Sequence, residues 1–122
     1  MTNAAGITKA LNDFVGNKIV RQIALESWGQ LVNDTPVDTG RARGSWRLKE
    51  NEPDPDSLPP GNYGSPTPPL PGNNPDNAKI YFITNNLPYI VPLNEGHSEQ
   101  AGAFFIETAL ARAMRLAIEK LT

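Results

Sequence analysis

The sequence of 122 residues contains no cysteine, which excludes disulfides, thiolate metal sites and thiol nucleophiles. It contains a single histidine, His97, so a zinc site would have to rely on carboxylates, and we expect no metal ion. No apolar run approaches the roughly 20 residues that span a bilayer, and we expect no association with membranes. Positive charge is not in excess, because the formal net charge is −2, and this balance is unlike that of a dedicated nucleic-acid-binding protein.

Sequence motifs for common cofactors and nucleophiles are also missing. No phosphate loop, dinucleotide-binding glycine pattern or nucleophile elbow occurs, so we expect no cofactor. The composition is that of an ordinary globular protein, with 39% hydrophobic and 20% charged residues. The length leaves room for one core, and we expect a single domain over residues 1–122.

Residues 4–33 have the spacing of an amphipathic helix. Their apolar side chains recur at intervals of three and four, at Ile7, Leu11, Phe14, Val15, Ile19, Ile23, Trp28, Leu31 and Val32. The apolar face is wide, which predicts a helix covered by more than one partner. The helix should end before Pro36, because a proline disfavours helical geometry in the residue that precedes it.

A second helix is predicted over residues 103–121. Its apolar residues share one face, formed by Ile106, Leu110, Ala113, Met114, Ala117 and Leu121. Charged residues lie elsewhere around this helix.

Strands are predicted between the two helices. Side chains alternate from Arg43 to Glu50, with Trp46 and Leu48 on one side, and this pattern predicts a half-buried strand. Residues 79–85 are apolar and rich in β-formers, which predicts a well-buried strand. Residues 86–96 contain two prolines that oppose a central strand, so an edge strand and an irregular helical turn both stay open.

Residues 51–78 hold nine of the twelve prolines, and we expect a long extended loop or arm with polyproline-II character. Such an arm could dock on a partner through Tyr63, Pro68, Pro69 and Leu70, or it could be a tolerated insertion. All segments together predict an α+β fold. In it, a long N-terminal helix and a C-terminal helix pack on a small antiparallel sheet, with a long Pro-rich loop.

The segment Thr35–Gly40 has the chemistry of a tight turn. Asp38 can accept a hydrogen bond from the backbone two residues on, and Gly40 can take a positive φ. We therefore expect Asp38 to cap the turn, and it could also pair with Arg43. The residues of this structural turn motif are Pro36, Asp38, Thr39, Gly40 and Arg43.

Two sequence motifs lie between the predicted helices. The first is Thr35-Pro-Val-Asp-Thr-Gly-Arg-Ala-Arg-Gly-Ser-Trp46, and the second is Asn85-Asn86-Leu-Pro-Tyr89 followed by Glu95-Gly96. Both motifs resemble those of the phage head–tail joining proteins, also called tail-completion, neck or minor tail proteins. In that family, too, the first motif follows a long N-terminal helix, and residues 104–110 are similar to the start of the family's closing helix. Ala42 stands where the family usually has leucine, and the Pro-rich insertion is unusually long.

The resemblance implies a structural virion protein and not an enzyme. Such proteins form a homo-oligomeric ring, commonly a hexamer, at the phage head–tail interface, where they complete the tail or join it to the head connector or adaptor. DNA passes through the lumen, and the tail terminator or tail tube proteins are neighbours. The implied location is the neck or tail of the virion, after assembly in the host cytoplasm.

Basic residues cluster within a short stretch, at Arg41, Arg43, Arg47 and Lys49. In a ring they are candidates for contacts with lumen DNA or with a neighbouring subunit. The alternative is a solvated strand face, whose charge the acidic residues that follow would balance. Those residues are Glu50, Glu52, Asp54 and Asp56.

Other functions stay open beside the head–tail joining ring. A tail terminator, which caps the tail tube, also forms a ring. Asp38-Thr39-Gly40 matches the signature of aspartic proteases, whose chemistry needs two neighbouring carboxylates that share a proton. Here, however, the triplet follows a helix and a proline instead of an apolar strand. A small bacterial adaptor is the remaining alternative.

Overall fold

The computed structural model describes residues 4–69, 80–96 and 104–121 and, within these ranges, the side chains of residues 18–120. Its elements in chain order are α1 (Ala4–Asp34), α2 (Arg41–Gly44), β1 (Arg47–Glu50), β2 (Tyr81–Thr84), α3 (Ile90–Asn94) and α4 (Phe105–Leu121). The fold is α+β, with helices and a small two-stranded antiparallel sheet, as the sequence predicts. Residues 51–69 form neither helix nor strand, and residues 70–78 of the predicted loop lie outside the described residues.

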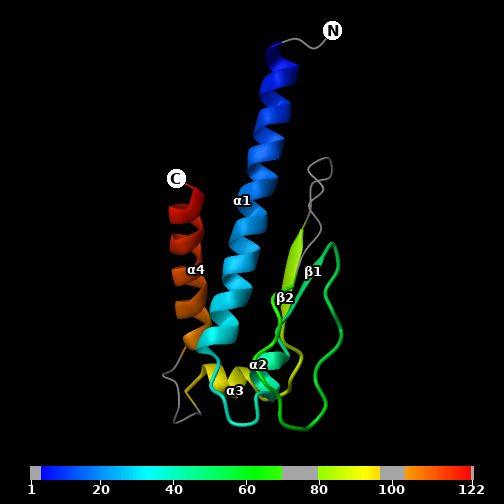
Figure 1. Ribbon diagram of the computed structural model, residues 1–122, viewed down its shortest axis with the longest axis vertical. Coiled ribbons are helices and arrows are strands. Elements are labelled where there is room, and N and C mark those ends of the chain that lie inside the picture. The colour runs from blue at the N-terminus through cyan, green and yellow to red at the C-terminus, as the bar shows by residue number, and fades with distance from the viewer. Residues whose placement is uncertain (1–3, 70–79, 97–103, 122) are drawn as a thin grey trace.

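The long helix α1 lies in the middle of the molecule, with α4 on one side and the β1–β2 sheet on the other (Figure 1). We expected both long helices to pack on the sheet, but α4 packs antiparallel against α1, and it is α1 that contacts both strands. The wide apolar face of α1 explains this arrangement, because one side of the helix covers the sheet while another receives α4.

Helix α1 runs without interruption from Ala4 to Asp34, which confirms the predicted helix. Its end is fixed by Thr35, whose backbone N–H donates to the Leu31 carbonyl oxygen at 3.1 Å. The hydroxyl of Thr35 donates to the same oxygen. Pro36 follows and cannot continue the helix.

The hydrophobic core gathers where α1, β1, α3 and α4 meet. Its buried members are Trp28, Leu31, Val32, Trp46, Ile90, Phe105 and Ala109. Two polar contacts cross it: Trp28 Nε1 donates to the Trp46 carbonyl oxygen at 3.1 Å, and Trp46 Nε1 donates to Thr35 Oγ1 at 2.8 Å. Both indole N–H groups are therefore paired, so neither tryptophan buries an unsatisfied donor.

The sheet is shorter and more exposed than the sequence predicts. Strands β1 and β2 pair in antiparallel register, with Leu48 opposite Ile83, and these two side chains pack against the core. The strand predicted within residues 79–85 is confirmed over Tyr81–Thr84, but its residues are half-buried and Ile80 is 65% exposed, so the expectation of a well-buried strand was wrong. With only two strands in the described sheet, both are edge strands.

The predicted strand from Arg43 to Glu50 also needs correction, because Arg41–Gly44 forms the short helix α2 and β1 begins at Arg47. A hydrogen bond of 2.9 Å from Gly44 N to the Gly40 carbonyl oxygen closes this helical turn. In the segment that the sequence left open, residues 90–94 form the helical turn α3. Pro92 fits there because the first turn of a helix has no acceptor for its N–H groups.

Small side chains line the contact between α1 and α4. Ala109, Ala113 and Ala117 of α4 are fully buried, and Ala24 and Ser27 of α1 are nearly so. Two ion pairs flank the contact: Arg112 Nη1 lies 2.5 Å from Asp34 Oδ2, and Lys120 pairs with Glu26. The alanines let the two helices approach closely.

The buried face of α4 differs from the apolar face that the sequence predicts. The larger residues Leu110, Met114 and Ile118 are 41%, 46% and 52% exposed, about 100° around the helix from the buried alanines. We call these three residues the outer stripe of α4. No helix in the described part of the chain is long and apolar enough to cross a membrane.

Candidate functional site

The turn between α1 and α2 is built by Thr39 and Gly40. Gly40 has a φ of 82°, as expected from its position in the turn. The hydroxyl oxygen of Thr39 accepts a hydrogen bond from Arg41 N at 3.2 Å. We expected Asp38 to make this kind of contact, but its side chain is exposed and has no partner among the described residues. Thr39 makes the contact in place of Asp38, because the Thr39 side chain is adjacent to the N–H groups that begin α2.

An extended segment of the Pro-rich region lies against this turn. The backbone N–H of Tyr63 donates to the Thr39 carbonyl oxygen at 2.6 Å. A Cβ atom on Gly40 would lie 2.1 Å from the Tyr63 carbonyl oxygen, so only glycine lets the two backbones approach this closely. The Tyr63 hydroxyl donates to the Pro59 carbonyl oxygen at 2.8 Å.

Leu58 makes a second set of contacts with α2. Its N–H donates to Ser45 Oγ at 3.1 Å, and its carbonyl oxygen accepts a hydrogen bond from Arg41 Nε at 2.9 Å. A Cβ atom on Gly44 would lie 2.6 Å from Leu58 Cδ1. Thr39, Gly40, Arg41, Gly44 and Ser45 thus form one receptor for the extended segment, which we call the cradle.

The described part of the predicted arm, residues 51–69, is therefore bound to its own chain through Leu58 and Tyr63. Tyr63, a predicted anchor for a partner, binds the cradle through its backbone N–H, and docking of the arm on a partner stays a prediction. Pro69 is half-buried and Pro68 exposed, while Leu70 lies outside the described residues. Leu58 was missed in the sequence, although it is the only large apolar side chain among residues 51–62 and so could have been recognised as an anchor.

The two motifs that carry the family resemblance contact each other. Asn85 Nδ2 donates to the Ala42 carbonyl oxygen at 2.9 Å, and the Arg41 guanidinium lies 5.9 Å from the centre of the Tyr89 ring. Asn86 Nδ2 donates to the carbonyl oxygens of Asp54 and Asp56, at 2.8 and 3.2 Å. The paired asparagines therefore join the second motif to α2 and to the start of the arm.

The four basic residues of the predicted cluster do not act alike. Arg41 is held by Leu58 and Tyr89, and Lys49 forms an exposed ion pair with Glu52 at 2.8 Å. The hydrogen bond from Lys49 and its positive charge lower the pKa of Glu52, and the same contact raises the pKa of Lys49. Arg43 and Arg47 are half-buried, and the Nε atom of each is buried without a hydrogen-bond partner among the described residues.

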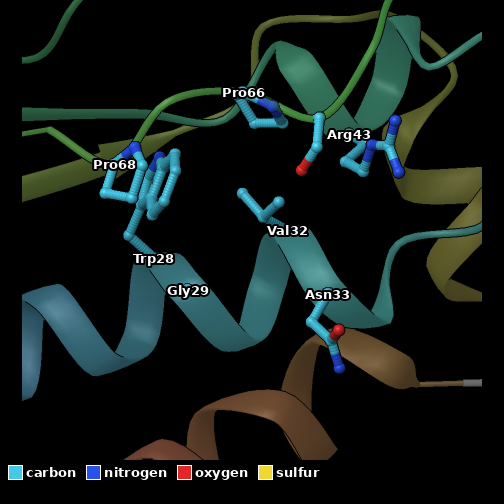
Figure 2. A pocket seen from close by; sticks show the side chains of 8 residues that line it. Trp28, Gly29, Val32, Asn33, Arg43, Pro66 and Pro68 are labelled. Carbon is cyan, nitrogen blue, oxygen red and sulfur yellow. The ribbon is translucent and has the colours of Figure 1, made fainter.

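A pocket of about 270 Å³ lies between α1 and the arm, with Arg43 on its rim. Figure 2 shows Pro66 and Pro68 of the arm across the pocket from Trp28 and Val32 of α1. Ser65 and Asn33 add polar groups to the lining. Arg43 forms no ion pair with any described residue, and in particular none with Asp38, contrary to one expectation from the sequence.

The described residues contain no group of three or more histidine and acidic side chains placed to bind a metal ion. His97 lies outside these residues. The described residues instead form four surface features that a protein segment could contact. These are the cradle, the Arg43 pocket, the exposed tip at Val37 and Asp38, and the outer stripe of α4. Comparisons with protein-family models, with curated proteins and with solved structures give no match for this chain.

Proposed function

We propose that this protein is a structural subunit of a phage neck, and that it forms a ring, a hexamer by analogy, at the head–tail interface. The observation that carries the proposal is the contact between the two motifs that resemble the head–tail joining proteins. Asn85 of the second motif bonds the backbone of Ala42 in the first, and Arg41 stacks on Tyr89. The two motifs, which are far apart in the sequence, thus form one structural unit.

The outer stripe of α4 supports an assembly function. Leu110, Met114 and Ile118 follow each other at intervals of one helical turn, and all three are more than 40% exposed. Exposed apolar residues are common singly, but an aligned row of them is typical of a surface that binds another protein.

The position of Asp38 does not fit the active site of an aspartic protease. Its carboxylate lies on an exposed turn between α1 and α2. In a protease, the two carboxylates are held close together so that they share a proton, and each sits in a loop of a strand-rich domain.

The test is the oligomeric state of the purified protein, measured by native mass spectrometry and by negative-stain electron microscopy. We expect closed rings with a central opening wide enough for duplex DNA. A protein that stays monomeric at high concentration would contradict the proposal.

A further inference from the structure

We propose that Asp38 of one subunit pairs with Arg43 of the next, with the tip of the turn, Val37 and Asp38, seated in the Arg43 pocket of the neighbour. The occupant is thus a second copy of this chain. The inference rests on the proposed ring and names one contact that would hold it together.

The pocket provides the first half of the argument. Arg43 is half-buried, its Nε is buried without a partner, and no described acidic side chain pairs with it. Removing a guanidinium from water is costly unless an anion compensates for the loss. The rest of the lining combines apolar surface with two polar side chains. The apolar surface comes from Trp28, Val32, Pro66 and Pro68, and the polar groups are the Asn33 amide and the Ser65 hydroxyl. This chemistry suits a carboxylate that enters beside an aliphatic side chain.

The tip of the turn provides the second half. Asp38 is exposed and has no partner among the described residues, and the adjacent Val37 is 39% exposed. Gly40 and Thr39 fix the turn that carries this pair, so the tip is presented by a rigid support. The chain therefore offers an aliphatic side chain beside an unpaired anion at the tip, and a pocket of mixed polar and apolar lining beside an unpaired cation.

The symmetry of this contact fits a ring. The tip and the pocket are distinct surfaces of one chain, so copies can bind head to tail through a heterologous contact. Each subunit gives its tip to one neighbour and its pocket to the other. Such contacts close into a ring when a whole number of the rotations from one subunit to the next adds up to one full turn.

Charge reversal tests the pairing. In Asp38→Arg the tip repels the Arg43 pocket of the neighbour, and in Arg43→Glu the pocket repels Asp38. We expect each variant alone to self-associate about tenfold or more weakly than the original chain, since close charge pairs at interfaces contribute at least this much. Sedimentation velocity measures the association, and circular dichroism checks that each variant keeps its fold.

Mixing the two variants is the decisive step. Where the two chains alternate, the arginine introduced by Asp38→Arg in one chain meets the glutamate introduced by Arg43→Glu in the next. At the following contact, the original Asp38 of the second chain meets the original Arg43 of the first. We therefore expect an equimolar mixture to regain assembly into rings with an even number of subunits. If Arg43→Glu does not fold, Arg43→Gln replaces it and must weaken association on its own.

Cross-linking gives an independent measurement, since the chain has no cysteine of its own. A Val37→Cys chain is mixed with a Ser65→Cys chain and treated with a short bismaleimide, so that Asp38 and Arg43 stay intact. We expect a covalent dimer, and a much weaker one when Ser57→Cys, an exposed position outside the pocket lining, replaces Ser65→Cys. Equal yields from the two pairs would contradict the seating of the tip in the pocket.

The outcomes separate this inference from the proposed function. If the original chain forms rings and the charge-reversal variants form them equally well, the proposed Asp38–Arg43 contact is wrong, whereas the proposed ring is supported. If the original chain does not self-associate at all, both proposals fall. Loss in each single variant with recovery in the mixture supports both.

Discussion

Gly40 lies directly against the backbone of Tyr63: a Cβ atom at position 40 would be 2.1 Å from the Tyr63 carbonyl oxygen. The φ of 82° at Gly40 is also one that residues with a Cβ rarely adopt. This single contact joins the turn after α1 to the arm, and it explains why the turn needs glycine.

Gly40→Ala should therefore destabilise the protein by about 2–4 kcal/mol, since it combines an unfavourable φ with a backbone clash. Chemical denaturation monitored by tryptophan fluorescence measures the loss. The matched control is Gly64→Ala, because Gly64 lies in the same arm and a Cβ there meets no atom within 4 Å. Equal stabilities of the two variants would contradict the close approach of the two segments.

Thr35 is the acceptor for a buried indole. Its Oγ1 receives the hydrogen bond from Trp46 Nε1 at 2.8 Å, and Thr35 is only 3% exposed. Thr35→Val keeps the shape but leaves the indole N–H unpaired, which should cost about 1–3 kcal/mol of unfolding free energy. Thr35→Ser keeps the hydroxyl and should lose clearly less. Urea denaturation compares the two, and a valine variant as stable as the serine variant would show that this hydrogen bond adds nothing.

The elements that the sequence predicts well are those whose signals are local. Helix α1 follows from a long run of apolar residues at helical spacing, and the positive φ of Gly40 follows from the turn residues around it. The same reasoning failed for Arg43, because alternation over a few residues is a weak signal and the Gly40–Gly44 hydrogen bond forms a helical turn instead.

The position of the arm depends on contacts between distant residues. Leu58 bonds Arg41 and Ser45, which lie 17 and 13 positions away along the chain, and it uses its own backbone groups. Every residue except proline has a backbone N–H donor and a carbonyl acceptor, so composition alone cannot show where Leu58 binds. The proline content predicted an extended chain and not its binding site.

The exposed pair Lys49 and Glu52 gives a pH-dependent prediction. Glu52 has its pKa lowered below the ordinary value of 4.5, first by the hydrogen bond from Lys49 and then by its charge. Because the pKa of Glu52 is lower in the folded than in the unfolded chain, the ionised carboxylate stabilises the folded state at pH values above the unfolded pKa. This contribution is lost as the pH falls through the folded pKa. Lys49→Ala should therefore raise the pKa of Glu52, as measured by carbon-13 NMR titration of its carboxyl group.

Lys49→Arg is the control for this titration, because it keeps a positive charge near Glu52. Its effect on the pKa of Glu52 should be smaller than that of alanine. Because both side chains are largely exposed, at 43% and 69%, high salt should also reduce the shift. If the pKa of Glu52 were the same in the original chain and in Lys49→Ala, the ion pair would not form in solution.

Ala113 decides how closely α4 approaches α1. It is fully buried between Ala109 and Ala117 along the same face, whereas Leu110, Met114 and Ile118 are exposed on the outer stripe. Ala113→Leu should cost about 1–3 kcal/mol or more, because the added carbons have no space between the two helices. Ala111→Leu is the control at an exposed position of the same helix and should change the unfolding free energy by less than about 0.5 kcal/mol. Thermal unfolding followed by circular dichroism compares the two variants, and an Ala113→Leu variant as stable as Ala111→Leu would contradict the close contact between α4 and α1.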